Sequence, residues 1–289
     1  MTFRETEQIY TDSLRLIYDR REAASLAWLS ISHVCKLERA EYLNLKDTEI
    51  PTDKFQSLLK ILEELKTGKP LQYVIGETEF YGMTFKVNPS VLIPRPETEE
   101  LVEWILSDIR KSKISIEGLK IIDIGTGSGC IPISLKKNLP EAQLFALDIS
   151  PEALGVSKQN AALNTTRIQF IQDDIRNSVS RELIGEKFGI IVSNPPYVTE
   201  AEKQQMLPNV LEHEPHLALF VPNDDPLIFY RAIADFAIKH TDTNGSLYLE
   251  INENLGEETV QLLKQMGFKN IELRQDLSGK DRMISSQIH

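Results

Sequence analysis

Cysteine is scarce in this sequence, which has Cys35 and Cys130 among its 289 residues. Two cysteines cannot build a disulfide framework or a four-cysteine zinc site, and they fit a reducing compartment. No stretch approaches the roughly 20 apolar residues of a membrane span. The N-terminus carries acidic residues from Glu5 onward and lacks the apolar core of a signal peptide. We therefore expect a cytoplasmic protein that binds no membrane.

Positive charge is also in short supply. The chain has 32 Lys and Arg against 43 Asp and Glu, and residues 1–80 have 11 against 14. Because nucleic-acid binding depends mainly on Lys and Arg facing phosphates, this balance argues against nucleic acid as a direct partner. A hydrophobic content of 41% is enough for a sizeable core, and the length favours two domains.

The hydrophobic pattern divides the chain into three parts. Residues 1–72 have helical periodicity, near 5–18, 21–34 and 37–44 and most clearly from Pro51 to Gly68, which predicts a helical bundle. Residues 73–93 form a linker whose aromatic and β-branched run, Tyr73 to Val87, predicts a β-hairpin. From 94 to 289, a helix near Pro96 precedes short apolar runs that alternate with helical stretches. This alternation predicts a mainly parallel sheet with helices on both faces.

A glycine-rich loop follows the first strand of this sheet. "DIGTGSGCI" places Gly125, Gly127 and Gly129 between a strand and a helix, where glycines let the backbone approach a nucleotide-type cofactor. A dinucleotide fingerprint needs a further glycine at Cys130. The observed spacing, preceded by Asp123, instead resembles the first motif of class I S-adenosylmethionine-dependent methyltransferases. The alternative interpretation is that the glycine loop only makes a tight connection between the strand and the helix and binds no ligand.

Acidic residues end the next two strands. Asp148 is suited to hold ribose hydroxyls, and it could also cap the helix that starts at Pro151. Asp173 and Asp174 end the third strand, where enzymes of the class just named often contact adenine. Both are equally consistent with solvated turn residues.

The fourth strand stops at a stiff turn, Asn194-Pro195-Pro196-Tyr197, because proline lacks an amide donor and has a fixed φ. The Asn194 side-chain oxygen and the Pro195 carbonyl are two acceptors that suit the two hydrogens of a planar NH2 group. Tyr197 could then lie against the flat face of that group. Holding both hydrogens directs the nitrogen lone pair at a methyl donor and stabilises positive charge on nitrogen. The turn therefore predicts methylation of an amide or aromatic amine.

The quoted motifs identify a family resemblance. "NPPY" resembles amino-methyltransferases that act on planar NH2 groups, and residues 68–103, "GKPLQYVIGETEFYGMTFKVNPSVLIPRPETEELVE", resemble the linker of bacterial release-factor glutamine N5-methyltransferases. "DIGTGSGCI", "SNPPYV" and "EPHLALF" match in the same order. The resemblance implies a class I methyltransferase fold, Rossmann-like with a seven-stranded mainly parallel sheet, joined through the hairpin to an N-terminal bundle that recognises the substrate.

The resemblance further implies methylation of the glutamine in the Gly-Gly-Gln motif of class 1 peptide chain release factors. S-adenosylmethionine would be the donor, S-adenosylhomocysteine the product, and the enzyme a monomer. Asn194, Pro195 and Tyr197 would be catalytic and, with Pro196, would bind the substrate glutamine. The cofactor-binding residues would be Asp123, Gly125, Thr126, Gly127, Ser128, Gly129, Asp148, Asp173, Asp174, Asn194 and Arg95.

Several assignments stay open at this point. Phe80, Arg95 and Glu97 could line the cofactor pocket, or Arg95 and Glu97 could tie the linker to the domain. "HEPH" at 213–216 is not a metal motif, because Pro215 breaks the helix that H-E-x-x-H needs; Glu214 and Pro215 are expected to shape the far side of the crevice. Alternative functions are methylation of a glutamine in another protein, a DNA adenine or cytosine-N4 methyltransferase, and a cofactor-binding protein without catalysis.

Overall fold

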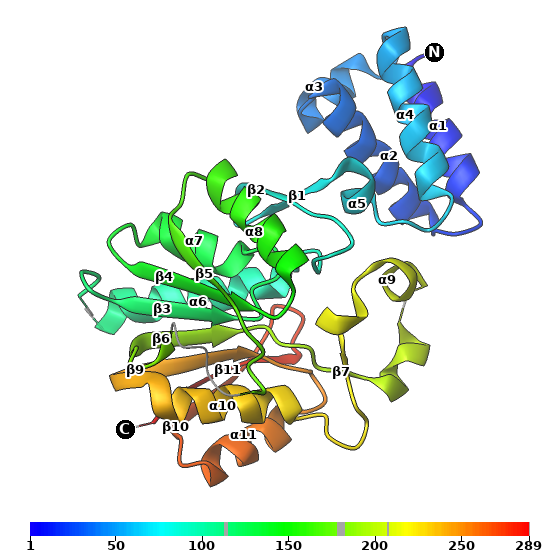
Figure 1. Ribbon diagram of the computed structural model, residues 1–289. Helices are drawn as coiled ribbons and strands as arrows, with labels where there is room; N and C mark the ends of the chain where they lie inside the picture. Colours follow the sequence, from blue (N-terminus) through cyan, green and yellow to red (C-terminus); the bar gives the residue numbers. More distant parts are fainter. Residues whose placement is uncertain (113–114, 178–182, 207, 289) are drawn as a thin grey trace. The chain divides into compact units, whose positions relative to one another are not determined.

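A computed structural model describes residues 1–112, 115–177, 183–206 and 208–288 of the chain (Figure 1). The chain forms two compact units, one made of Met1–Gly76 and Leu207–His213 and the other of Glu77–Met206 and Glu214–His289. Within the described ranges, no helix is both long enough and apolar enough to span a membrane.

The first unit is a bundle of helices, as the periodicity predicts. The helices are α1 (Phe3–Leu14), α2 (Arg20–Cys35), α3 (Arg39–Leu45), α4 (Thr52–Leu65), α5 (Leu71–Ile75) and α9 (Pro208–His213). Along α4, the helically spaced Leu58, Leu62 and Leu65 are buried in the core of this unit. The Tyr10 hydroxyl of α1 donates to the Leu58 carbonyl at 2.6 Å, so the polar tip of a buried ring is satisfied.

The predicted hairpin is present but starts later than expected. Tyr73 lies in α5, which ends when Gly76 adopts a left-handed conformation at φ 77°. The strands are β1 (Glu77–Phe80) and β2 (Met83–Lys86). The two residues between them, Tyr81 and Gly82, both have positive φ, at 49° and 70°. That geometry gives the tight turn whose twist matches an antiparallel pair.

The second unit is built on one seven-stranded sheet. In spatial order its strands are β10 (Lys269–Gln275), β11 (Asp281–Gln287), β9 (Thr241–Glu250), β6 (Phe188–Ser193), β3 (Lys120–Ile124), β4 (Gln143–Asp148) and β5 (Ile168–Gln172). The strands from β9 to β5 are parallel, whereas β11 pairs antiparallel with both β9 and β10. The prediction of a mainly parallel sheet is confirmed.

Helices cover both faces of this sheet (Figure 1). One group is α6 (Pro96–Ser112), α7 (Cys130–Asn138) and α8 (Pro151–Leu163); the other is α10 (Ile228–His240) and α11 (Gly256–Gln265). Alternate residues of a strand serve opposite faces: Ile121 and Leu144 pack with the first group, and Ile122 and Phe145 with the second. The central strands are therefore mostly apolar, as expected of a parallel sheet buried on both sides, with Asp123 of β3 as an exception.

The register of the sheet brings the predicted motifs to one edge. Ile124, the last residue of β3, is opposite Leu147 of β4 and Ser193 of β6. Asp148 and Asn194 follow these residues directly, so they flank the glycine loop at the carboxyl ends of the strands. Short elements complete this region: β7 (Val198–Thr199) pairs with β8 (Phe220–Val221), and η2 (Glu200–Gln205) and η3 (His216–Ala218) lie between them in the sequence.

Candidate active site

The glycine loop after β3 has the conformation that glycine favours. Gly125, Gly127 and Gly129 have φ values of 75°, 53° and 81°. At Gly129, which caps α7, a Cβ atom would lie 2.9 Å from the Ser157 Cβ of α8. The buried Asn160 of α8 donates to the Ser128 carbonyl at 2.9 Å. Glycine is needed here both for the backbone angles and for the close approach of α8.

Asp148 supports this loop from β4. One of its carboxylate oxygens accepts from the Gly127 amide at 2.8 Å and the other from the Ser150 amide at 2.9 Å. Helix α8 is capped by the Ser150 hydroxyl, which accepts from the Ala153 amide at 3.1 Å. Capping of α8 is therefore the role of Ser150. Burial raises the pKa of the Asp148 carboxyl, while the hydrogen bonds from the backbone oppose that rise.

Asp123, in β3, is fully buried, and neither of its carboxylate oxygens accepts a hydrogen bond from a described residue. Burial raises the pKa of this carboxyl to about 7. The Thr126 hydroxyl opposes this rise in pKa, yet it forms no hydrogen bond with Asp123 or with any other described residue. The position next to the glycine loop thus holds an acidic group without a partner.

The region after β5 contains a feature that the sequence analysis missed. The Asp174 carboxylate accepts two hydrogen bonds from the Arg176 guanidinium, at 3.0 and 2.8 Å, which lowers the pKa of Asp174. The same guanidinium lies 5.4 Å from the centre of the Phe229 ring of α10. Asp173, whose carboxylate accepts from the Asp174 amide, lines the same cavity as these three residues. The acidic pair is therefore part of an ordered wall.

The Asn194–Tyr197 turn begins where β6 ends. The Ser193 hydroxyl donates to the Ile124 carbonyl at 2.6 Å, which joins the turn to the glycine-loop strand. The Asn194 side-chain nitrogen donates to the Thr98 hydroxyl oxygen of α6 at 3.1 Å. The Tyr197 ring packs against the core next to α10, and its hydroxyl donates to Glu250 at 3.2 Å. Burial raises the pKa of Tyr197, so its hydroxyl stays protonated.

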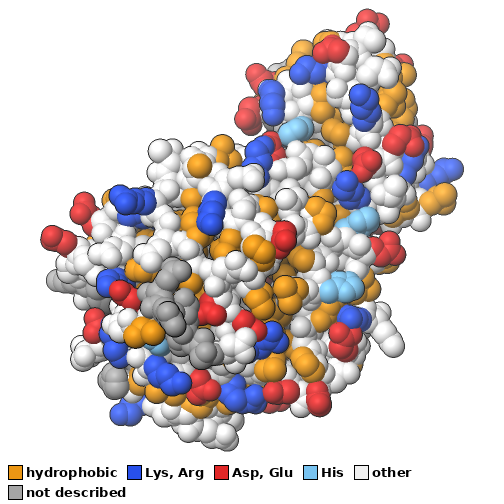
Figure 2. Space-filling model, in the orientation of Figure 1, with side chains coloured by type: hydrophobic (Ala, Val, Ile, Leu, Met, Phe, Trp, Pro, Cys, Tyr) orange, Lys and Arg blue, Asp and Glu red, His pale blue; other side chains and the backbone are white. Residues whose placement is uncertain are grey.

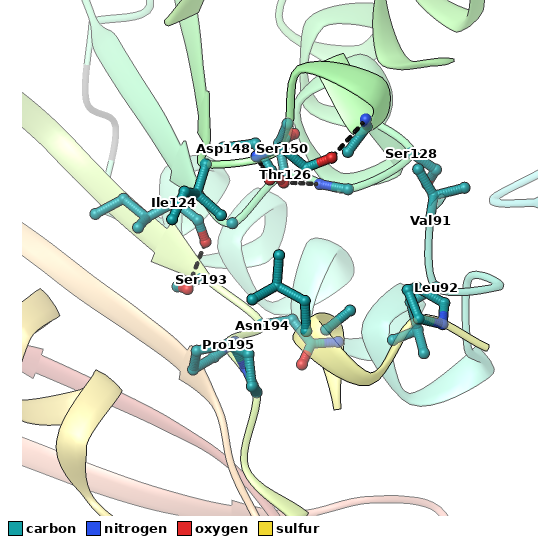
Figure 3. Close-up of a pocket in the computed structure, with 18 of the residues that line it drawn as sticks. Val91, Leu92, Ile124, Thr126, Ser128, Asp148, Ser150, Ser193, Asn194 and Pro195 are labelled. Atoms are coloured by element: carbon teal, nitrogen blue, oxygen red, sulfur yellow. Dashed lines mark hydrogen bonds between the residues drawn. The ribbon is translucent and has the colours of Figure 1, made fainter. Parts of the chain in front are cut away.

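These motifs surround one cavity of about 300 Å³. Figure 3 shows Asn194 and Pro195 across the cavity from Thr126, Asp148 and Ser150. Its walls include, among the predicted residues, Arg95, Gly125, Thr126, Gly127, Ser128, Asp148, Asp173, Asp174, Asn194, Pro195 and Pro196. Three other predicted residues do not line it: Asp123 is buried in β3, Gly129 ends the loop against α8, and Tyr197 ends the turn with its hydroxyl on Glu250.

The segment that leads from the hairpin into α6 and the loop after α9 close further sides of the cavity; Val91, Leu92, Pro94 and Arg95 line it from the first of these. Arg95 lines the cavity and also donates to Glu214 at 2.6 Å, so it ties its segment to the domain; its contact with a cofactor stays a prediction. Glu214 is buried, accepts from the Ile93 amide and thus ties the linker to this loop. The candidate position of Phe80 is wrong: the ring is buried in the core against Phe85. Pro215 borders the cavity, as expected.

Comparisons with known proteins agree with this geometry. A family model described as PrmC N-terminal domain matches residues 10–76, and one described as Methyltransferase small domain matches residues 103–217. A release factor glutamine methyltransferase from Flavobacterium psychrophilum is 47% identical over 95% of this chain and 95% of its own length. The chain belongs to the release factor glutamine methyltransferase family. A family protein from Bacteroides thetaiotaomicron is 39% identical, over 95% of this chain and 96% of its own.

Solved structures show the fold of this family member. The catalytic domain of hMettl16, in complex with the MAT2A 3′UTR hairpin 6, matches with a TM-score of 0.58 at 12% identity, over 90% of this chain and 92% of that chain. The T. thermophilus 16S rRNA N2 G1207 methyltransferase RsmC, in complex with AdoMet and guanosine, matches with a TM-score of 0.53 at 17% identity, over 74% of this chain and 50% of that one. The predicted class I methyltransferase fold is confirmed, and the chain is an enzyme of a methyltransferase family.

Proposed function

We propose that this enzyme transfers a methyl group from S-adenosylmethionine to the side-chain amide nitrogen of the glutamine in the Gly-Gly-Gln motif of class 1 peptide chain release factors. The family supports the reaction class. The observation that carries the proposal is the position of Asn194: its amide, held by Thr98, borders the same cavity as the glycine loop and Asp148. A planar amide and a nucleotide-like donor can therefore meet there.

The residues of the cavity fit S-adenosylmethionine as the donor. The glycine loop lets backbone approach the ligand closely, and Asp148 has acceptor capacity left for hydroxyl groups of a ribose. Asp123 is a buried acid without a partner beside this loop, which suits a ligand that carries an ammonium group. When bound, the donor supplies an electrophilic methyl carbon. We propose that the end of the cavity formed by Asp173, Asp174, Arg176 and Phe229 binds the adenine base of the donor.

The turn residues would orient the accepting nitrogen. An amide nitrogen is a weak nucleophile because its lone pair is delocalised, so its direction matters for an in-line displacement. Asn194 Oδ1 and the Pro195 carbonyl would each accept one hydrogen of the substrate NH2. These two oxygens also stabilise the positive charge that develops on nitrogen. After transfer, the extra proton on the methylated amide is acidic enough to leave to water.

Charge favours a protein substrate over nucleic acid. Over the face of the described chain drawn in Figure 2, Lys and Arg side chains are interspersed with Asp and Glu. Residues 1–80 carry more acidic than basic side chains, as noted above. A basic grip on phosphates is the expected mark of a nucleic-acid enzyme. We propose that the helical residues 1–72 instead recognise the release factor, and that the enzyme acts as a monomer.

The test uses labelled S-adenosylmethionine, purified release factors and duplex DNA in the same reaction. Mass spectrometry should locate one methyl group on the glutamine of the Gly-Gly-Gln motif. A release factor with that glutamine replaced by asparagine is the matched control and should take no label. Label on DNA alone, or on another glutamine with the motif untouched, would overturn the substrate assignment.

A further inference from the structure

Four side chains form a chain of hydrogen bonds that starts at the cavity wall, which Asn194 and Thr98 line, and continues into the core. Asn194 Nδ2 donates to Thr98 Oγ1 at 3.1 Å, and Thr98 Oγ1 donates to Glu250 Oε2 at 2.6 Å. At the other end, the Tyr197 hydroxyl donates to Glu250 Oε1 at 3.2 Å. The chain connects the first turn of α6, the end of β9 and the turn after β6. Glu250 and Thr98 are 1% and 2% exposed, so bulk water does not compete for these bonds.

The direction of the chain follows from proton counting. A hydroxyl has one proton to donate, and Thr98 gives it to the carboxylate of Glu250. The Thr98 oxygen can then only accept, so the Asn194 side chain must present its NH2 group to Thr98. Asn194 Oδ1 is left facing away from Thr98, and it accepts no hydrogen bond from a described residue. An acceptor oxygen is thereby held ready at the cavity wall.

Protonation of Glu250 would remove the reason for this direction. A protonated carboxyl can donate to Thr98, whose hydroxyl could then donate to Asn194 in turn. The Asn194 amide would be stable with its oxygen towards Thr98 and its NH2 group towards the cavity. A donor would then face the NH2 group of a substrate amide, which also needs acceptors. The same four residues would hold the turn, but with the wrong polarity for the proposed substrate.

We propose that Thr98 and Glu250 are positioning residues, and that the negative charge of Glu250, relayed by the Thr98 hydroxyl, sets Asn194 as a hydrogen-bond acceptor. The proposal rests on the proposed function, because that function supplies the substrate NH2 group from which Asn194 Oδ1 would accept a hydrogen bond. Methyl transfer should therefore depend on ionised Glu250. Neither residue needs to touch the substrate or the donor.

The surroundings of Glu250 place its ionisation in a useful range. Burial raises the pKa of its carboxyl to about 7, and the hydrogen bonds from Thr98 and Tyr197 oppose that rise. Arg282 of β11 also favours the charged form, whereas Glu97 of α6 disfavours it. Tyr230 of α10 and Cys130 of α7 also interact with Glu250, and burial keeps both of them neutral.

The kinetic test compares Thr98→Val, Thr98→Ser and Glu250→Gln with the wild type, using S-adenosylmethionine and a class 1 release factor. Thr98→Val keeps the shape and loses the relay, so kcat should fall by about 10²-fold, the cost of one misplaced preorganised group. Thr98→Ser should restore kcat to within about threefold, because it keeps the hydroxyl. In all three variants the Kd of S-adenosylmethionine, measured by calorimetry, should stay unchanged.

The pH profile separates positioning from support of the fold. Wild-type kcat should rise with pH through about 7, following ionisation of Glu250, and Glu250→Gln should lose this limb. Asp108→Asn is the matched control, because Asp108 also accepts from a tyrosine hydroxyl, that of Tyr248 at 3.0 Å, away from the cavity. The control should keep both kcat and the limb. If Thr98→Val and Glu250→Gln keep wild-type kcat and the wild-type profile, the proposal is overturned.

A direct readout does not need the release factor. In protein labelled with ¹⁵N at asparagine side chains, the Asn194 NH2 resonance should titrate with the carboxyl of Glu250, and this response should vanish in Thr98→Val. An Asn194 resonance that ignores pH in the wild type overturns the relay even if methyl transfer is normal. Conversely, a wild type that shows the titration but never labels the release factor retains the relay and removes the proposed substrate.

Discussion

The unpartnered acid of the glycine-loop strand yields a quantitative prediction. Asp123 is fully buried, and burial raises the pKa of its carboxyl from 3.8 to about 7. The folded state then binds this proton more tightly than the unfolded state does. The contribution of Asp123 to the free energy of unfolding should fall as pH rises from 3.8 to about 7, and this loss should be complete above that range.

The size of the effect follows from the shift. A pKa that is higher by one corresponds to about 1.4 kcal/mol. The rise from 3.8 to about 7 therefore means that the charged Asp123 carboxylate lowers the unfolding free energy by about 4 kcal/mol at pH 8. Asp123→Asn has nearly the same shape and carries no charge at any pH. Relative to wild type, it should gain about 3 kcal/mol more in unfolding free energy at pH 8 than at pH 4.5. Taking this difference of differences cancels the other titrating groups, Glu250 included.

Urea unfolding of both proteins at the two pH values measures this quantity, with equal m-values as the check on a common unfolding reaction. Parallel stability curves, with a difference of differences under about 0.5 kcal/mol, would refute the argument that the site buries an uncompensated acid. Saturating S-adenosylmethionine provides a second arm. If its ammonium group binds beside Asp123, the wild type should gain more stability from the ligand at pH 8 than Asp123→Asn does.

Further predictions concern the Asn194 turn, Asp148 and the glycine loop. Asn194→Ala should lower methyl transfer by about 10²- to 10³-fold with little change in Tm, and near-normal turnover would refute the proposed role of Asn194 in orienting the substrate NH2 group. Asp148→Ala should weaken the binding of S-adenosylmethionine in calorimetry, and an unchanged Kd would count against its ribose role. Gly129→Ala should destabilise the fold by about 1–3 kcal/mol, because of its φ of 81° and the close Ser157 Cβ. Gly155→Ala, in α8 with free space around it, is its control and should be neutral or stabilising.

The backbone of the site could be predicted from the sequence, because its determinants are local. Alternating short apolar runs specify a parallel sheet, and a glycine loop or a Pro-Pro turn that follows a strand is placed at the carboxyl edge. The hairpin shows where local patterns mislead. The aromatic and β-branched run includes Tyr73, yet Pro70 and Gly76 enclose a helical turn there. Phe80 belongs to the same region, and strand alternation sends its ring into the core.

The side-chain pairs of the site could not be predicted in the same way. Asn194 and Thr98 are 96 residues apart, Arg95 and Glu214 are 119 apart, and no local periodicity connects the members of either pair. The role of Glu250 near the site could have been predicted from its position at the end of a strand. The sheet order places β9 next to β6, so an acid that ends β9 must lie close to the Asn194 turn. Phe229 had none, because its role depends on the orientation of Arg176.

Asp123 and Glu250 are buried carboxyls near the carboxyl ends of the sheet strands, and the charged form of each lowers the stability of the fold. Glu250 resembles Asp123 in that burial raises the pKa of its carboxyl from 4.5 to about 7. Its contribution to the unfolding free energy is therefore complete below 4.5 and is lost as pH rises through about 7. The proposed acceptor state of Asn194 needs that same ionisation. Between pH 6 and 8 the Tm of the wild type should fall while methyl transfer rises, and Glu250→Gln should weaken both trends. A Tm that rises over this range would refute the argument that the buried charge of Glu250 lowers stability, and a rate that does not rise would refute its role in setting Asn194 as an acceptor.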